Sequence, residues 1–207
     1  MLETNVDQKS FKFKIVLLGE GCVGKSSLVL RFVENKFSCK HLSTIQASFQ
    51  NKTVNVEDCQ ADLHIWDTAG QEKYHALGPI YYRGSNGVLL VFDITDRKSF
   101  EKVKNWVLEI KTCLGNTAEI LIVGNKIDLE EERQVTRQDA EAYAESEGAL
   151  YMETSAQDNV GISDAFESLT AKMIEHSRTR STEPPSTNRS IRLIDNDEAE
   201  RSKKCCR

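Results

Sequence analysis

Short apolar runs alternate with longer stretches of helical period along most of the chain. The short runs are rich in β-branched residues, whereas the longer stretches place apolar residues at intervals of three and four. This alternation is typical of an α/β fold in which helices flank a mostly parallel sheet. The predicted strands span residues 14–19, 87–94, 119–126 and 149–156, and the predicted helices span residues 26–37, 99–114, 137–148 and 162–176.

Two further strand-like runs, residues 46–56 and 61–69, follow each other with no helical stretch between them. A short acidic segment containing Glu57 and Asp58 joins them. A connection this short suits a hairpin rather than a crossover. We therefore expect these two runs to form an antiparallel pair at one edge of the sheet.

The helical period stops near residue 177 in this chain of 207 residues. Pro184 and Pro185 follow, among many Ser, Thr, Asn and Arg residues, which is typical of disorder. We predict one folded domain at residues 11–176, with a flexible N-terminus at 1–10 and a disordered tail at 177–207.

The charge and the cysteines limit the class of protein. The 27 Lys and Arg residues against 32 Asp and Glu residues give a net charge of -5, which argues against a general affinity for nucleic acid. The predicted tail reverses this sign, with eight basic and five acidic side chains. The six cysteines show no bridging framework, and we find neither a signal peptide nor an apolar run of membrane-spanning length. We expect a reducing, cytosolic environment.

The sequence GEGCVGKS, residues 19–26, separates the first predicted strand from the first predicted helix. Its spacing, G-x-x-x-x-G-K-S, suits a backbone loop that wraps around phosphate oxygens at a helix N-terminus. Lys25 would reach the β- and γ-phosphates, and the Ser26 hydroxyl would bind Mg²⁺. The alternative is an ordinary glycine-rich turn. The predicted phosphate-binding residues are Gly21, Cys22, Val23, Gly24, Lys25, Ser26 and Ser27.

The sequence NKID, residues 125–128, ends another predicted buried strand. The Asp128 carboxylate can accept two hydrogen bonds from guanine, from N1–H and from the exocyclic amine, whereas adenine has no such pair of donors. Asn125 would connect this loop to the phosphate loop, and the Lys126 stem would cover one face of the base. The alternative is an ordinary strand-to-helix turn with exposed charges.

The sequence WDTAGQE, residues 66–72, follows the second strand of the predicted hairpin. Asp67 is suited to hold Mg²⁺ through water, and Gly70 offers a backbone N–H to the γ-phosphate. Gln71 could orient an attacking water molecule, which makes it the candidate catalytic residue.

Taken together, GEGCVGKS, Thr44, DTAGQ, NKID and the ETSA of residues 153–156 resemble the Ras superfamily of small GTPases over residues 11–176. The segment IWDTAGQEKYHALGPIYYRGSNGVLLVFDIT is similar to the Rab family, especially its endosomal branch. The resemblance implies a P-loop GTPase domain, with a mostly parallel six-stranded sheet, one antiparallel edge strand and helices on both faces. It also implies a monomeric switch domain that binds GTP or GDP with magnesium and hydrolyses GTP slowly without an activating protein.

The resemblance also assigns residues to the nucleotide. Thr44 would contact Mg²⁺ and the γ-phosphate, Phe37 would pack against the guanine, and Ser155 and Ala156 would contact the guanine carbonyl. The sequence departs from the family pattern at Gln157, where Lys is common, at Gln46, where many Rab proteins have Gly, and at Cys22. None of these departures removes a magnesium or phosphate ligand.

By the same resemblance, Ile45, Phe49, Trp66 and Tyr81 would form the effector surface. The alternative for the aromatic residues is a role in the core. GTP would order the segments around Thr44 and Gly70, and hydrolysis would release them.

The sequence RSKKCCR at residues 201–207 resembles the double geranylgeranylation site of Rab proteins, at Cys205 and Cys206. The alternative is metal binding or an incidental cysteine pair. The expected partners are effectors, an exchange factor, an activating protein, and chaperones of the Rab escort and GDP-dissociation-inhibitor type. We expect the chain on the cytoplasmic face of the early endosome through its lipid anchor, cycling through the cytosol.

Two other classes of protein share part of this pattern. A P-loop ATPase or kinase would also use Lys25 and Ser26, but it would not need Asp128. A module that binds the nucleotide without hydrolysing it would not need Gln71. The sequence does not identify the effectors, the exchange factor, the activating protein or the rates of exchange and hydrolysis.

Overall fold

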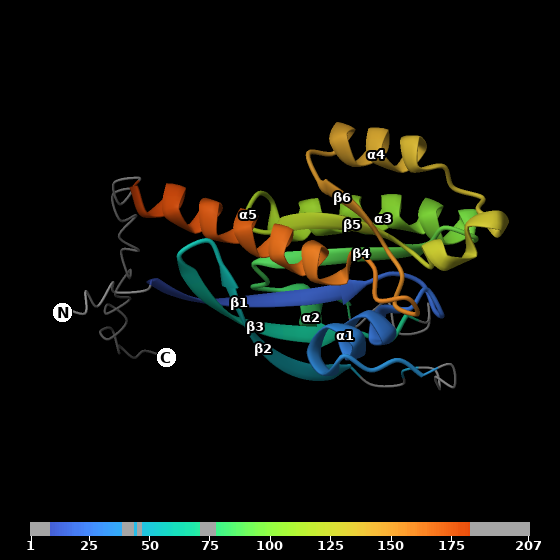
Figure 1. Cartoon of the computed structure of the whole chain (residues 1–207). Helices are drawn as coiled ribbons and strands as arrows, with labels where there is room; N and C mark the ends of the chain where they lie inside the picture. The colour runs from blue at the N-terminus through green and yellow to red at the C-terminus, as the bar shows by residue number, and fades with distance from the viewer. Residues whose placement is uncertain (1–8, 39–43, 45–46, 71–77, 183–207) are drawn as a thin grey trace, which may run out of the picture.

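The computed structural model describes residues 9–38, 44, 47–70 and 78–182. Six strands and the helices between them follow one another in the order that the hydrophobic pattern predicts (Figure 1). The strands are β1 (Lys9–Leu18), β2 (Ser48–Val56), β3 (Cys59–Asp67), β4 (Gly87–Asp93), β5 (Glu119–Asn125) and β6 (Leu150–Thr154). The helices are α1 (Lys25–Glu34), α2 (Gly78–Tyr82), α3 (Arg97–Leu114), the 3-10 helix η2 (Ile127–Glu132), α4 (Arg137–Ser146) and α5 (Ile162–Thr182).

The strands form one sheet in the order β2-β3-β1-β4-β5-β6. Five of them run parallel, while β2 pairs antiparallel with β3, from Ser48 opposite Asp67 to Val56 opposite Cys59. This confirms the predicted fold class and the predicted hairpin at the edge of the sheet. Because the two strands of the hairpin are antiparallel, the start of β2 and the end of β3 lie side by side.

Helices cover both faces of the sheet, and each face has its own hydrophobic core. On one face, α1 and α5 pack over the hairpin, β1 and the edge of the central strands. The rings of Phe32 from α1 and Phe166 from α5 stack there, with centroids 3.9 Å apart. On the other face, α2, α3 and α4 pack on β1, β4 and β5. All seven residues of β4 are buried, as expected for a central parallel strand with helices on both sides.

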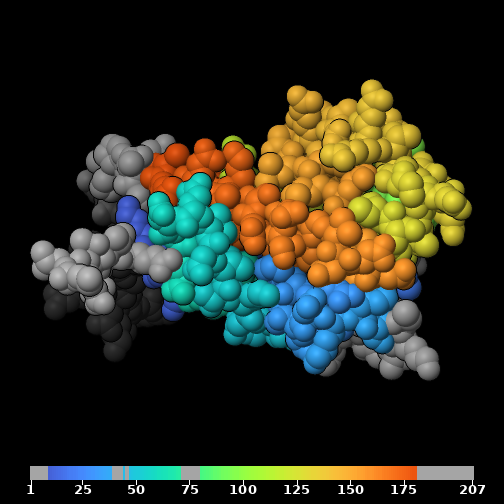
Figure 2. Space-filling view, in the orientation of Figure 1, coloured from blue at the N-terminus to red at the C-terminus, as the bar shows by residue number. Residues whose placement is uncertain are grey.

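Three details extend the predicted elements. The short helices α2 and η2 were not expected, because neither is long enough to show a helical period. The helix α5 continues to Thr182, beyond the predicted domain boundary at 176. The polar C-terminal end of α5 is bonded to the hairpin. Arg178 donates a hydrogen bond to Cys59 Sγ and forms an ion pair with Glu57 in the hairpin turn. Figure 2 shows this end of α5, in orange-red, lying against the hairpin in teal.

Candidate functional site

The predicted site residues gather at the carboxyl edge of the parallel strands. Asp67, Asp93, Asn125 and Thr154 end four of the five parallel strands, and the loop after β1, the fifth, reaches the same edge. In Figure 1 this edge lies at the right, beside the start of α1. In open α/β sheets, ligands bind outside this edge. The three sequence motifs, although far apart along the chain, therefore meet in one place.

The phosphate loop has the backbone that its glycines require. Gly24 precedes α1 in the left-handed region with φ 99°, and a Cβ at this position would overlap the side-chain amide of Asn125. The first turn of α1 contains no acidic residue, and no side chain caps its N–H groups. The positive end of the helix is therefore available to an anion.

The ammonium group of Lys25 lies at the centre of this loop. The side chain is buried, and Nζ donates hydrogen bonds to the carbonyl oxygens of Gly19 and Glu20, each at 2.8 Å. Burial lowers the pKa of Lys25 to about 8, against the opposing attraction of Asp67 and Glu20. A phosphate group next to Nζ would add negative charge and favour the protonated lysine.

Three oxygen atoms converge at the predicted magnesium site. Ser26 Oγ lies 2.8 Å from Thr44 Oγ1 and donates a hydrogen bond to Asp67 Oδ2 at 2.5 Å. Hydroxyl and carboxylate oxygens are the hard donors that Mg²⁺ prefers, so these residues fit the ion. Gly70 lies against the same loop, because a Cβ at this position would overlap Lys25 Nζ and the Glu20 carbonyl oxygen.

The NKID motif is bonded directly to the phosphate loop. Asn125 is buried, and its side-chain Nδ2 donates to the Val23 carbonyl oxygen at 2.9 Å. Thr154 at the end of β6 donates to Asn125 Oδ1 at 3.1 Å, which fixes the orientation of the amide. One hydrogen-bonded chain thus joins β6, β5 and the phosphate loop.

Asp128 and Lys126 are positioned by the neighbouring strand ends. Ser155 Oγ donates to Asp128 Oδ1 at 2.5 Å, which holds the carboxylate in place. Lys126 lies in the left-handed region with φ 69°, and its Nζ forms an ion pair with Asp93 at 2.6 Å. Both side chains are half-buried, so part of each remains accessible.

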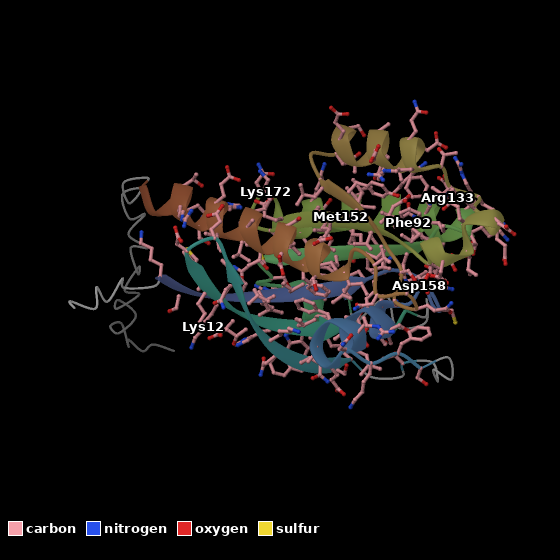
Figure 3. All side chains as sticks on the ribbon, in the orientation of Figure 1. Lys12, Phe92, Arg133, Met152, Asp158 and Lys172 are labelled. Carbon is pink, nitrogen blue, oxygen red and sulfur yellow. The ribbon has the colours of Figure 1, made fainter. Side chains whose placement is uncertain are left out.

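A second network of charged side chains joins the segment after the NKID motif to β6. The guanidinium of Arg133, just after η2, binds Glu153 of β6 through two nitrogens and also forms an ion pair with Glu130. Tyr151 donates a hydrogen bond to Glu153 at 2.8 Å, and burial followed by this bond raises the pKa of Tyr151 above its ordinary value. Figure 3 shows Arg133 on the upper side of the molecule at this edge.

The predicted contacts on the other side of the base also reach the site. Phe37 is half-buried and packs against the core formed with α1 and α5. Ser155 and Ala156 are buried, and Ser155 pairs with Val160 through two backbone hydrogen bonds of 3.0 Å. Residues 155–160 therefore form a closed turn beside α1.

The three predicted effector aromatics form a continuous row. The rings of Phe49 and Trp66 lie 5.2 Å apart between centroids, and those of Trp66 and Tyr81 lie 6.4 Å apart. Phe49 is 45% exposed, and Ile80 next to the row is 71% exposed. Trp66 and Tyr81 also pack against the core on the α3 side. A role in the core and a role in effector binding are therefore compatible for these two residues.

Some predicted residues lie outside the described part of the chain, and some supporting residues were missed. Gln71, Ile45, Cys205 and Cys206 belong to the first group. Thr68, Asp93 and Thr154 belong to the second, and Thr68 donates a buried hydrogen bond to the Leu17 carbonyl oxygen. Each of the missed residues lies within the last three residues of a predicted strand, which is the signal that could have identified them.

Comparisons with known proteins agree with this arrangement. The model of the Ras family matches residues 14–175. The chain is 54% identical to Ras-related protein Rab-21 of Homo sapiens over 196 residues, which cover 91% of this chain and 87% of the relative. It is 52% identical to Ras-related protein Rab-21 of Dictyostelium discoideum over 204 residues, which cover 94% and 96%. It is 43% identical to Ras-related protein Rab-5A of the same organism over 202 residues, which cover 98% and 99%.

Proposed function

The chain belongs to the Ras family of small GTPases and, within it, to the Rab proteins, and we propose that the residues gathered at the carboxyl edge form its nucleotide site. As a member of this family it binds guanine nucleotide, hydrolyses GTP to GDP and phosphate, and acts as a switch in vesicular traffic. The observation that carries the site assignment is the 2.9 Å hydrogen bond between Asn125 and the Val23 carbonyl oxygen, which joins the base motif to the phosphate loop.

The base would lie between the NKID motif on one side and Phe37 with the turn at residues 155–156 on the other. Asp128 accepts hydrogen bonds from N1–H and the exocyclic amine of guanine while Ser155 holds its other side. The Lys126 stem covers one face of the ring, and Phe37 packs against its edge. Ser155 and Ala156 contact the guanine carbonyl. The complementarity of Asp128 to two donors selects guanine over adenine.

The phosphates would lie over the N-terminus of α1. Backbone N–H groups of the loop from Gly21 to Ser27 bind their oxygens, and Lys25 exchanges its two carbonyl partners for the β- and γ-phosphates. Ser26, Thr44 and Asp67, the last through water, would hold magnesium, which neutralises charge on the β- and γ-phosphates.

Hydrolysis would depend on residues at the end of β3. Gly70 donates its backbone N–H to the γ-phosphate, and Gln71 orients the attacking water and helps to stabilise the charge of the transition state. An activating protein is required for a fast rate, because it completes this arrangement.

The hairpin would carry the switch. Thr44 precedes β2 and Gly70 follows β3, and these ends of the two strands lie side by side. Both segments bind the γ-phosphate in the GTP state and lose this partner on hydrolysis. The row of Phe49, Trp66 and Tyr81 lies on the same hairpin and on α2, so effectors would bind a surface that depends on the nucleotide. Ile45, the fourth residue of the proposed effector surface, lies outside the described residues.

Family membership implies effectors, exchange and activating proteins, and chaperones of the GDP-dissociation-inhibitor type. No helix within residues 9–38, 47–70 and 78–182 is long and apolar enough to cross a bilayer. We assign membrane attachment to geranylgeranyl groups on Cys205 and Cys206, handled by an escort protein, at the cytoplasmic face of early endosomes.

The nucleotide that co-purifies with the protein tests this assignment most directly. We expect GDP or GTP together with magnesium, and we expect guanosine nucleotides, but not ATP, to displace it. Displacement by ATP would favour a P-loop ATPase or kinase. Stable binding of GTP without hydrolysis, even with an activating protein, would favour a module that only binds the nucleotide.

Replacing Gln71 by Leu should preserve GTP binding and slow stimulated hydrolysis by on the order of a thousandfold, because the amide acts in the transition state rather than in binding. Single-turnover hydrolysis with an activating protein measures this effect. Gln134→Leu, at an exposed position before α4, is the matched control. A Gln71→Leu variant that hydrolyses GTP at the stimulated rate of the unmodified protein would remove Gln71 from the catalytic role.

Replacing both Cys205 and Cys206 by Ser should move the protein from membranes to the cytosol and leave nucleotide binding intact. Lipid chains contribute about 0.8 kcal/mol per buried CH₂, against about 1 kcal/mol for each nearby Lys or Arg, so the lipids dominate. Membrane fractionation and the intact mass of the protein from cells measure the effect, with Lys203→Ser and Lys204→Ser as controls for the basic charges. An unlipidated mass of the unmodified protein would overturn the assignment.

A further inference from the structure

Arg31, in the last turn of α1, contacts the turn at residues 156 and 157, the end of its own helix, and the Phe37 ring. Its Nε donates to the Ala156 carbonyl oxygen at 3.0 Å, and Nη2 donates to the Gln157 carbonyl oxygen at 3.0 Å. Its Nη1 donates to the Asn35 carbonyl oxygen at 3.2 Å, at the end of the same helix. The guanidinium carbon lies 5.7 Å from the centroid of the Phe37 ring.

The turn that Arg31 binds is held at its two ends by its own hydrogen bonds. Ser155 is held by its two backbone hydrogen bonds to Val160, and its hydroxyl accepts from the Asp158 N–H at 2.9 Å. The carbonyl groups of residues 156 and 157, between these anchors, point toward α1 and bind Arg31. Figure 2 shows the turn, in orange, directly against α1 in blue, and Figure 3 places Asp158 at this contact.

The planarity of the peptide bond transmits this contact to the other side of the turn. In a trans peptide the C=O and the following N–H point in opposite directions. Because Arg31 draws the two carbonyl groups toward α1, it sets the direction of the N–H groups of Gln157 and Asp158. A planar guanidinium is suited to this, since its donors have a fixed fork geometry that an ammonium group lacks.

We propose that Arg31 is a positioning residue for guanine recognition, which fixes the 155–157 turn and the Phe37 ring relative to each other so that the turn meets the guanine 6-oxo group and Phe37 meets the ring. The proposal rests on the assignment of the nucleotide site given above. The three hydrogen bonds of Arg31 go to Asn35, Ala156 and Gln157 rather than to the phosphate loop or the predicted magnesium ligands. Arg31 would therefore act through the residues that contact the base.

The first measurement is the release rate of ribose-labelled fluorescent GDP from the full chain, purified with its nucleotide and magnesium. Arg31→Ala should release GDP at least about tenfold faster, the range expected for the loss of one charge-assisted hydrogen bond. Arg137→Ala is the matched control, since Arg137 lies on the outer surface of α4 and pairs with Glu141. Equal release rates from Arg31→Ala and the unmodified protein would overturn the proposal.

The second measurement separates positioning from a general stabilising role. In 6-thio-GDP a sulfur atom replaces the 6-oxo oxygen, while N1–H and the amine that Asp128 reads remain. The unmodified protein should prefer GDP, and Arg31→Ala should lower the ratio of the two affinities toward one. If Arg31 only caps α1, both affinities would fall by the same factor and the ratio would not change, which would overturn the proposal.

Arg31→Lys keeps the charge and the alkyl stem, and so guards against a variant that fails to fold. We expect it to lower the same affinity ratio by a smaller factor than Arg31→Ala. A lysine variant with the full selectivity of the unmodified protein would overturn the role of the guanidinium fork. If the unmodified protein binds neither GDP nor 6-thio-GDP, the nucleotide-site assignment fails instead, which distinguishes the two failures.

Discussion

The base side and the phosphate side of the site are built from different kinds of contact. On the base side, the bond from Asn125 to Val23 and the bond from Ser155 to Asp128 connect protein groups that can remain bonded when a base is bound. On the phosphate side, Lys25 is bonded to two carbonyl groups of its own loop, and Ser26 is bonded to Asp67. These are the atoms that phosphate and magnesium would need.

This difference assigns the choice of base to one side of the site and the tight binding of the nucleotide to the other. The base side is preorganised, so binding there costs little rearrangement and discriminates strongly between bases. The phosphate side must exchange internal bonds for bonds to the ligand, so its affinity depends on the charge of the phosphates and the ion. Substitutions on the two sides should therefore change different properties.

The largest expected effect is a change of base preference in Asp128→Asn. An amide cannot accept from both guanine donors, whereas it can donate to the carbonyl that xanthine has in place of the amine. GDP affinity should fall by on the order of 10⁴, because one of the two guanine donors is left unpaired in the complex, and xanthosine diphosphate should bind instead. Competition between the two diphosphates measures this switch.

The matched control for that switch is Asp158→Asn, an exposed carboxylate in the next loop (Figure 3). It should keep the preference for guanine. If Asp128→Asn still binds GDP in preference to xanthosine diphosphate, Asp128 does not read the base and the base side has been assigned to the wrong residue.

A smaller effect, confined to the phosphate side, is expected for Ser26→Asn. The loss of the hydroxyl should weaken magnesium and GTP binding by on the order of 10- to 100-fold, and GDP binding by less, because magnesium would neutralise phosphate charge and GTP carries more of it than GDP. Chelation of magnesium should speed nucleotide release from the unmodified protein but change little in the variant.

Nucleotide titrations at fixed magnesium measure that difference, and Ser146→Asn on the exposed side of α4 is the control. Equal losses of GTP and GDP affinity would contradict the role of Ser26. A change of base preference in Ser26→Asn would contradict the separation of the two sides.

The smallest expected effect is a gain of stability in Cys22→Gly. Cys22 has φ 63°, a conformation that costs a residue with a Cβ roughly 1–2 kcal/mol, whereas glycine loses roughly 0.5–1 kcal/mol of chain entropy. The free energy of unfolding should therefore rise by about 0.5 kcal/mol. Nucleotide affinity should not change, because the Cys22 side chain is exposed and the loop binds through its backbone.

Chemical denaturation of the nucleotide-bound protein measures that gain. Gly24→Ala is the opposite case, since its φ is also positive and its Cβ would overlap Asn125. It should lose both stability and nucleotide affinity. A stability of Cys22→Gly below that of the unmodified protein would show that the strain at this position is not relieved by glycine.

The parts of the fold that could be predicted are those that repeat a period. The central strands and the helices α1, α3, α4 and α5 each bury one face or both, and their sequences show it. The helix α2 is too short to show a period, and the end of α5 is polar because it binds the hairpin turn rather than the core. Nothing local in the sequence marks such long-range polar contacts.

The site shows the same division. The glycines, Lys25, Asn125 and Asp128 occur at spacings that the chemistry requires, so the motifs could be recognised and placed at one edge. Arg31 could not, because it occupies an ordinary polar position of an amphipathic helix, and its partners on the turn lie 125 and 126 residues away. Its position became meaningful only when the folded chain brought α1 against residues 155–157.

The hydrogen bond from Asn125 to the Val23 carbonyl oxygen also has a consequence for how this protein can evolve. It makes the loop that distinguishes bases a support for the loop that retains phosphates. A lineage that drifted toward another base by moving β5 would shorten the lifetime of every nucleotide complex at the same time. A mutation that weakens the preference for guanine would therefore also change how long the nucleotide stays bound. Evolution cannot alter base preference here without also altering the lifetime of the complex.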